Sequence, residues 1–457
     1  MRLSRALSRN RKLSRGIEQL ETRRLLTIVV DDPGDISDPN DGRTTLREAV
    51  AEANAAGANE DIVFTCDVSE VSLTQGQITV GAMGHDITID GMLDCPDEGG
   101  MVTVNADNQF RVFNIDDGDG FKQTAGVIFR NLNITGGSAI EGGGILNRER
   151  LTLSLVNIFG NTATNLGPPS VSYGGGLANV DGSVEISDST ITNNLATSII
   201  PIEQAGFGGG LSSRGDAGEV TLLNTSIGSN TVMGNGGGLF VRGGTLKLDG
   251  TTVRDNKAGG VDDASHNGGG LALYGGGPGG VAPLEVDLTD TTITGNLVAN
   301  NSLFLNTTSH GGGMYVRGNG TVRMTRTMLL SNEAGGDALA NAMAAPRGGG
   351  AFFVADSATG APLNIEIEES QIDGNTSGLG GGGLFASGGM ASPLVVNIER
   401  TSISGNAAAG NGGSHGNRRN ASSVPRSRVP RDLSAFNIDH QWARHSAAGE
   451  QPAPTQA

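Results

Sequence analysis

Residues 236–256 read GGGLFVRGGTLKLDGTTVRDN, and the same pattern recurs along the middle of the chain. Each copy begins with a triple glycine and ends with an Ile/Val/Leu-x-x-Asn signature 19–28 residues later. The residues ten, eight and three positions before that asparagine are apolar in every copy, as Leu246, Leu248 and Val253 are here. A spacing of two puts the first pair on one face of a strand, and the polar residues between them suit the other face. The unit therefore predicts short strands without helical periodicity.

The repeat is long enough to identify a solenoid. Triplets begin, at a mean step of about 34 residues, at Gly142, Gly174, Gly208, Gly236, Gly268, Gly311, Gly348 and Gly381. The signatures end at Asn161, Asn194, Asn230, Asn256, Asn296, Asn332, Asn375 and Asn406. Insertions of different lengths fall between the strands and leave the strand pattern unchanged, which is typical of stacked repeats.

A unit of this length with three short strands makes one coil of a parallel β-helix. The predicted fold class is all-β, a right-handed parallel β-helix, because parallel crossovers overwhelmingly have that hand. Glycine at the triplet supplies a positive φ and lacks the Cβ that would obstruct the next turn. The eight asparagines are predicted to form a structural ladder, since stacked amides can hydrogen-bond from coil to coil.

Residues 28–140 precede the triplets and contain one amphipathic helix, TTLREAVAEANAAG at 44–57. Leu46, Ala49, Val50 and Ala53 form its apolar face. Five strand-like segments follow and read as the first coils. An end of a β-helix exposes strand edges and an open core. The helix is therefore expected to cap that end, ahead of any catalytic use of Arg47 or Glu48.

Three parts of the chain are similar to known families. The segment from Thr44 to Val50 resembles the CSLREAI-type module of bacterial surface β-helix proteins, with Thr44 and Thr45 in place of the family's Cys and Ser. The repeats over 141–411 resemble polymorphic-outer-membrane-protein repeats, with IxxN where the family has FxxN. LETRRLL at 20–26 resembles a LEPRxLL export leader. These resemblances imply a pectin-lyase-like solenoid exported to the cell surface, outer membrane or extracellular space.

Charge divides the 457-residue chain, whose net charge is −17, into three parts. Residues 1–27 are strongly basic and are interpreted as a disordered export leader. The acidic body repels phosphate backbones, so no nucleic-acid partner is expected. Residues 412–457 turn basic and lose all periodicity, which predicts a disordered tail that is truncated or out of frame. No apolar run approaches the ~20 residues that span a bilayer, and a monomer is expected.

Few residues point to chemistry. Cys66 and Cys95 are the two cysteines; a disulfide is predicted if the protein is exported, with two buried thiols as the alternative. His85, His266 and His310 lack metal-ligand spacing and are interpreted as turn residues. No cofactor is expected. Calcium is considered at two acidic segments, DDPGDISDPNDG at 31–42 and DDGDG at 116–120, although solvated turn acids are the favoured interpretation.

Two further columns recur within the units. Six residues after the first glycine stand Arg148, Arg214, Arg242 and Arg317, which either bind acidic glycans or, as favoured, neutralise part of the acidic body. Four residues after it stand Phe240, Tyr315, Phe352 and Phe385. Pointing inward they would form a core stack, and pointing outward a strip for sugars; the inward orientation is expected.

The function expected from these observations is that of an exported surface or matrix protein, structural or adhesin-like and without catalysis, for which glycans are the candidate partners. The alternative is a polysaccharide lyase or glycoside hydrolase on the same fold, since one scaffold carries both classes. An enzyme would need carboxylates that converge on one groove. The loops between coils share few acids, which favours the non-catalytic function.

Overall fold

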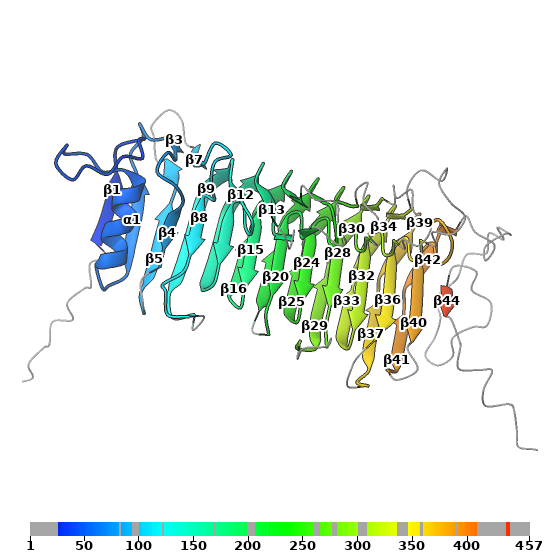
Figure 1. Cartoon of the computed structure of the whole chain (residues 1–457). Helices are drawn as coiled ribbons and strands as arrows, with labels where there is room; N and C mark the ends of the chain where they lie inside the picture. Colours follow the sequence, from blue (N-terminus) through cyan, green and yellow to red (C-terminus); the bar gives the residue numbers. More distant parts are fainter. Residues whose placement is uncertain are drawn as a thin grey trace, which may run out of the picture.

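The chain folds into a parallel β-helix (Figure 1). The computed structural model describes residues 26–408 and 436–438, apart from gaps at 82–83, 94–99, 121–122, 166, 168–170, 199–205, 217, 260–265, 277–280, 300–308, 336–345, 357–359, 389–391. Strands stack coil upon coil into three long sheets, and neighbouring strands in each of them pair in parallel apart from β6 and β7, which pair antiparallel. The predicted all-β solenoid is confirmed.

The largest sheet has 22 strands, two from most coils. They are β1 (Leu26–Val30), β2 (Glu60–Phe64), β3 (Glu70–Ser72), β5 (Asp86–Asp90), β6 (Met92–Leu93), β7 (Gly100–Asn105), β9 (Gly126–Thr135), β12 (Arg150–Phe159), β16 (Ser183–Ser187), β17 (Thr190–Thr192), β21 (Glu219–Leu223), β22 (Ser226–Gly228), β25 (Gly244–Asp249), β26 (Thr252–Arg254), β29 (Leu284–Thr289), β30 (Thr292–Thr294), β33 (Gly320–Thr325), β34 (Met328–Leu330), β37 (Leu363–Glu368), β38 (Gln371–Asp373), β41 (Leu394–Glu399) and β42 (Ser402–Ser404).

Two narrower sheets complete each coil. The nine-stranded sheet contains β10 (Ser138–Ala139), β13 (Thr162–Asn165), β18 (Leu195–Ser198), β23 (Thr231–Val232), β27 (Lys257–Ala258), β31 (Leu297–Val298), β35 (Glu333–Ala334), β39 (Thr376–Ser377) and β43 (Ala407–Ala408). The eleven-stranded sheet contains β4 (Ile78–Val80), β8 (Phe113–Ile115), β11 (Ile145–Asn147), β15 (Leu177–Val180), β20 (Leu211–Arg214), β24 (Leu239–Arg242), β28 (Leu271–Tyr274), β32 (Met314–Gly318), β36 (Ala351–Ala355), β40 (Leu384–Gly388) and β44 (Phe436–Ile438). A separate pair consists of β14 (Ser172–Tyr173) and β19 (Gly206–Phe207).

A typical repeat coil has four strands rather than the expected three. In one coil β24 is followed by β25, β26 and β27, and β25 and β26 lie in the same sheet. Gly250, with φ 58°, breaks the strand between them. Asp188, Asn224 and Asp290 hold the same left-handed conformation in other coils, which short polar side chains tolerate better than most. A single extra bend of this kind does not change the apolar spacing, so the sequence pattern did not reveal it.

One continuous hydrophobic core runs through the stack from Ile28 to Ala386. Leu246, Leu248 and Val253, the apolar positions of the quoted repeat, are at most 1% exposed. Their equivalents in the neighbouring coils stack directly on them, as the pairing of β25 with β29 shows. Each coil therefore shields the apolar side chains of the next, as expected for a solenoid.

The helix α1 (Leu46–Ala55) lies at the N-terminal end of the stack, where it contacts β1, β2 and β4 (Figure 1). Thr45 and Glu48 form a capping box at its first turn. Its predicted apolar face is buried, with Leu46, Ala49, Val50 and Ala53 all at most 2% exposed. Asn54 fixes the other end, because its side chain donates to Thr79 O and accepts from Gly81 N.

Glycine is required at the triplets for two reasons. The first glycine of every triplet has a positive φ, for example 75° at Gly236. The second approaches the backbone of the next coil. A Cβ on Gly237 would lie 2.2 Å from Gly269 O and 2.7 Å from the carbonyl carbon of Lys257. Both neighbours are backbone atoms, one in the turn before β28 and one in β27, so neither can move without disturbing the stacking.

We therefore expect Gly237→Ala to lower the free energy of unfolding by about 2 kcal/mol, the usual cost of an extra methyl in a well-packed interior. Chemical denaturation of both proteins would measure it. Gly388→Ala is the matched control, because a Cβ there would meet nothing closer than 3.7 Å. Equal destabilisation by the two substitutions would contradict the steric explanation.

The C-terminal end of the stack is less well covered than the N-terminal end. Leu394, Val396, Ile398 and Ile403 pack on the core but are only partly buried. Within the tail expected to be disordered, Phe436–Ile438 forms β44, which pairs in parallel with β40. The edge of β40 offers unpaired backbone groups with which an extended segment of this kind can pair. The rest of 412–457 and residues 1–25 lie outside the described residues.

Candidate functional site

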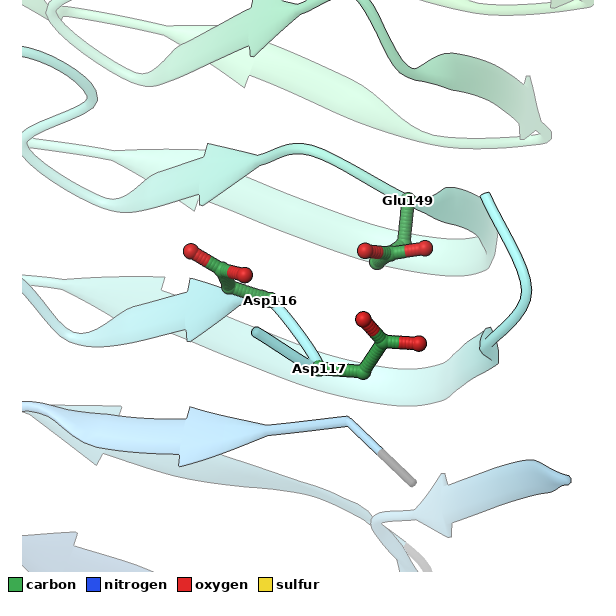
Figure 2. A group of neighbouring side chains, drawn as sticks. All are labelled: Asp116, Asp117 and Glu149. Atoms are coloured by element: carbon green, nitrogen blue, oxygen red, sulfur yellow. The ribbon is translucent and has the colours of Figure 1, made fainter. Parts of the chain in front are cut away.

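The turn that follows β8 lies against the next coil and brings three carboxylates together. Asp116 and Asp117 come directly after β8, and Glu149 stands between β11 and β12, one coil further along. The pairing of Ile115 with Asn147 sets this register and places the two turns side by side. One carboxylate oxygen from each residue lies within 4.8 Å of the others, and Figure 2 shows the side chains of Glu149 and Asp117 pointing toward one another.

Glu149 is the unusual member of this acidic cluster, by which we mean Asp116, Asp117 and Glu149. Its side chain is 0% exposed, yet neither carboxylate oxygen has a hydrogen bond of normal geometry. Burial, and secondarily the charge of Asp117, raise the pKa of Glu149 to about 7, although the backbone N–H groups of Asp117 and Ala125 lie close enough to oppose the shift in part. A buried carboxylate without partners is costly and calls for a structural explanation.

The two aspartates are better supported than Glu149. Burial alone would raise the pKa of Asp117, but hydrogen bonds, first that from Thr124 Oγ1 at 2.6 Å, outweigh it and the net pKa is lowered. Asp116 Oδ1 accepts from Gly118 N at 2.9 Å, and its other oxygen lies 3.5 Å from Arg148 Nε. The cluster therefore holds several oxygen ligands facing one another, and in the described part of the chain Arg148 forms an ion pair with it on the Asp116 side.

Such a donor set can hold a hard divalent cation, since Ca²⁺ prefers carboxylate and other oxygen ligands. The segment 116–120 was one of the two considered for calcium from sequence, but Glu149 was not foreseen. It lies 32 positions beyond Asp117 in an unremarkable NRER stretch, and only its place in the repeat register could have suggested it.

The other acidic segment, 31–42, uses its carboxylates locally. Asp35 is 3% exposed and pairs with Arg47 through two bonds of 2.8 and 3.0 Å. Asp31, Asp38 and Asp41 each accept a backbone N–H. The bonds of Asp31, Asp38 and Asp41 are those of turn acids, whereas Asp35 is buried in an ion pair. Together they anchor the loop in front of the capping helix.

The eight repeat asparagines stack in one column with a regular bonding pattern. From Asn194 onward, the Oδ1 of each accepts both the backbone N–H and the Nδ2–H of the asparagine one coil earlier, at 2.9–3.1 Å. Each Nδ2 also donates to a backbone carbonyl of the earlier coil. The column is fully buried except at Asn406, and it begins on Gly137 N, where the earlier copy lost its asparagine.

A second, shorter polar column lies five residues after the first glycine. Asn147 Nδ2 donates to Asn179 Oδ1 at 2.8 Å, and Asn179 Nδ2 donates to Ser213 Oγ at 3.1 Å. All three residues are buried. Asn147 also holds the backbone of Glu149 through Glu149 N and O. Sequence analysis missed this column, although aligning the triplets would have shown it.

The aromatic column does not point into the core, and the inward orientation expected for it is wrong. Leu239 and Val241 belong to the main core, whereas Phe240 between them does not. Tyr315, Phe352 and Phe385 form a cluster of their own on the outer side. Because strand residues alternate, an apolar run such as LFV fills both faces, and the sequence could not tell which face each occupied.

The rings do not form an exposed strip for sugars either. Tyr315 and Phe352 stack with centroids 5.6 Å apart, Phe352 and Phe385 with 4.9 Å, and none of the three is more than 5% exposed. His310 stacks on Phe352 at 4.2 Å, and the Arg347 guanidinium lies 4.9 Å from the Phe385 ring. His310 was expected in a turn but forms bridges to neighbouring coils. The ring faces pack against one another and against His310 within the column, so they are not free to stack on a sugar.

His310 should make stability depend on pH. Burial, and then the charge of Arg347, lower its pKa to about 4. The pKa of His310 in the folded state lies below the ordinary value of 6.5. The stability that uncharged His310 contributes is therefore fully present above pH 6.5 and is lost as the pH falls toward 4. We expect the protein to lose up to about 3 kcal/mol over that range relative to His310→Phe. Denaturation at a series of pH values would measure this; parallel curves would contradict it.

The arginine column mostly pairs with acids. Arg214 Nη2 lies 2.5 Å from Glu141 Oε1, and its guanidinium lies 4.1 Å from the Tyr173 ring centroid. Arg317 donates from Nε and Nη2 to one oxygen of Asp356. Arg148 pairs with Asp116 as described, and Arg242 is exposed. These pairs support charge neutralisation over glycan binding for three of the four arginines.

Cys66 is disulfide-bonded, and no described cysteine is free. The chain has one other cysteine, Cys95, which lies outside the described residues. A bond between the two is the pairing that the sequence predicts.

Comparison of the chain with models of protein families, with curated proteins and with solved structures finds no match. Of the residues that the structure describes, none belongs to a helix long and apolar enough to cross a bilayer.

Proposed function

We propose that the chain is an exported β-helical protein that acts as a structural or adhesive element at the cell surface or in the extracellular matrix. The observation that carries the proposal is the unbroken stacking of coils from the capping helix to Asn406 (Figure 1). Eleven parallel strands in one sheet, at about 4.8 Å each, give a rod roughly 50 Å long. A rod held by its own core and ladders presents the outward-facing residues of its described strands at a fixed spacing, which suits attachment or display.

Two further features support this proposal. The disulfide at Cys66 is typical of proteins that mature in an oxidising compartment outside the cytosol. The outer face of the largest sheet carries its charges as pairs between coils. Arg323, for example, lies 3.0 Å from Glu285 and 3.3 Å from Glu366, which belong to strands on either side. Such networks use the exposed acids to join coils rather than to converge on a substrate.

One observation bears on the enzymatic alternative. The raised pKa of Glu149 beside the charged Asp117 resembles the paired carboxylates of polysaccharide-cleaving enzymes. Glu149 is, however, 0% exposed, so a sugar chain cannot reach its carboxylate in this conformation. The structural function is therefore the better supported of the two.

Surface exposure in the native host tests the proposal. Cells that produce the full chain, and cells that produce it without residues 1–27, would be treated intact with protease and probed for the chain. We expect digestion of the full chain only, with a cytosolic marker protected in both. A full chain that resists protease until the cells are lysed would overturn the assigned location. Release of oligosaccharides from an acidic polysaccharide, lost in Glu149→Gln, would favour the enzyme instead.

A further inference from the structure

The acidic cluster of Asp116, Asp117 and Glu149 is built as a site rather than as a solvated turn. We propose that it binds a single Ca²⁺ ion that ties two successive coils together. Two ligands come from the turn after β8 and the third from the next coil, so one ion would bridge two turns that backbone pairing and the Asp116–Arg148 ion pair already join (Figure 2).

The case for a ligand rests on Glu149. Carboxylates that cluster at a protein surface are commonly solvated by water. Glu149, in contrast, is 0% exposed, and neither of its carboxylate oxygens has a hydrogen bond of normal geometry. Its carboxylate is directed at Asp117 (Figure 2). Glu149 is buried and Asp117 is half-buried, so the two facing carboxylates repel each other when both are ionised, and a cation between them would relieve that repulsion.

In the part of the chain that the structure describes, one ion pair, that with Arg148, brings positive charge to the cluster. Arg148 lies on the Asp116 side, 3.5 Å from Asp116 Oδ2. Thr124 contacts Asp117 Oδ2 and, at 2.9 Å, Asp119 Oδ2, so it orients the aspartates without neutralising them. A divalent cation among the three carboxylates would offset the negative charge that the ion pair with Arg148 does not neutralise.

Ligand chemistry favours Ca²⁺ over Mg²⁺. Ca²⁺ accepts six to eight oxygens in a flexible arrangement at about 2.3–2.6 Å, and the cluster, whose three oxygens all lie within 4.8 Å of one another, can surround such an ion. Mg²⁺ demands a near-ideal octahedron at about 2.0–2.1 Å and usually keeps several of its waters, so it is the less suitable ion for three carboxylates from two coils. Calcium also accepts water as further ligands, which the turn at Gly118 and Gly120 leaves room for, since a Cβ on either glycine would meet nothing within 4 Å.

Calorimetric titration of the purified full chain with CaCl₂, after removal of metal by a chelator and at physiological salt, tests the proposal. Salt suppresses diffuse binding to the acidic surface. We expect one saturable site in the native chain, at least tenfold weaker binding in Glu149→Gln and in Asp117→Asn, and weaker binding of Mg²⁺ to all three proteins. Asp38→Asn and Glu185→Gln remove exposed acids elsewhere and should bind Ca²⁺ as the native chain does.

Melting temperatures separate loss of the site from loss of the fold. Without Ca²⁺, Glu149→Gln should melt no lower than the native chain, because it removes a buried charge without partners. With Ca²⁺, the native chain and both controls should gain stability, and Glu149→Gln should not. The proposal fails if the native chain shows no saturable site, if Glu149→Gln and Asp117→Asn bind as tightly as the native chain, or if the control variants lose binding equally.

Discussion

Asn256→Ala is expected to destabilise the protein by about 3 kcal/mol or more. Asn256 Oδ1 accepts from Asn230 N and Asn230 Nδ2, and Asn256 Nδ2 donates to Ile227 O and to the next asparagine in the column. Truncation leaves the Asn230 N–H and the Ile227 carbonyl in a fully buried position without these partners. Each such group costs about 1–3 kcal/mol when it is left unpaired in a buried position.

The loss should spread beyond one coil, because a solenoid transmits stability only between neighbours. Denaturant unfolding gives the total effect, and amide hydrogen exchange would show faster exchange in the coils on both sides of Asn256. Asn397→Ala is the matched control: Asn397 is exposed, and its one contact, to Glu399, is long at 3.4 Å. A cost below about 1 kcal/mol for Asn256→Ala would mean that the ladder does not hold the coils together.

Arg47→Ala is expected to loosen the N-terminal cap at a cost of about 3–5 kcal/mol, the usual effect of removing one partner of a buried ion pair. Asp35 has a side chain with 0% exposure, accepts two bonds from Arg47, and accepts two more from the N–H groups of Thr74 and Gln75. Arg47 also donates to the carbonyls of Gly76 and Gln77. One guanidinium thus fixes the loop before α1 and the turn before β4.

Limited proteolysis and denaturation would measure this effect, with new cleavage expected between residues 31 and 60. Arg43→Ala removes an exposed guanidinium from the same region and serves as control. Arg47→Lys should recover little, because an ammonium group cannot make the forked contact to Asp35. If Arg47→Ala and Arg43→Ala unfold alike, the cap is held by the apolar face of α1 and not by this ion pair.

The sequence predicted the contacts of Asn256 and Arg47 only in part. The Asn256 column was predicted because a polar residue recurs at one position of an otherwise apolar repeat, and recurrence at a fixed period implies stacking. Arg47 was assigned to a cap on the amphipathic pattern of its helix. Its partner Asp35 was interpreted only as a turn acid, since nothing in a run of aspartates shows which one is buried.

The sequence by itself determined the coil, the core positions and the capping helix. All three follow from local periodicity: spacings of two within strands, of about 34 between coils, and the single amphipathic segment at 44–57. The strand and coil spacings recur in eight copies, so a copy with an irregular sequence can be aligned with the regular ones. The fold could be predicted from this repeat because each coil packs mainly against the coils next to it, so one unit and its period describe the whole stack.

Only the tertiary structure decided the features that depend on which residues meet across coils. Glu149 and Asp117 approach one another because β8 and β11 pair in one register, and a shift of one residue would separate them. Phe240 lies outside the core because strand alternation, not hydrophobicity, sets its direction. β44 pairs with β40 because an open sheet edge accepts a distant segment that has no repeat of its own. Which residues meet across coils, and toward which side of the strand a side chain points, depend on how the coils stack, so the sequence of a single repeat does not determine them.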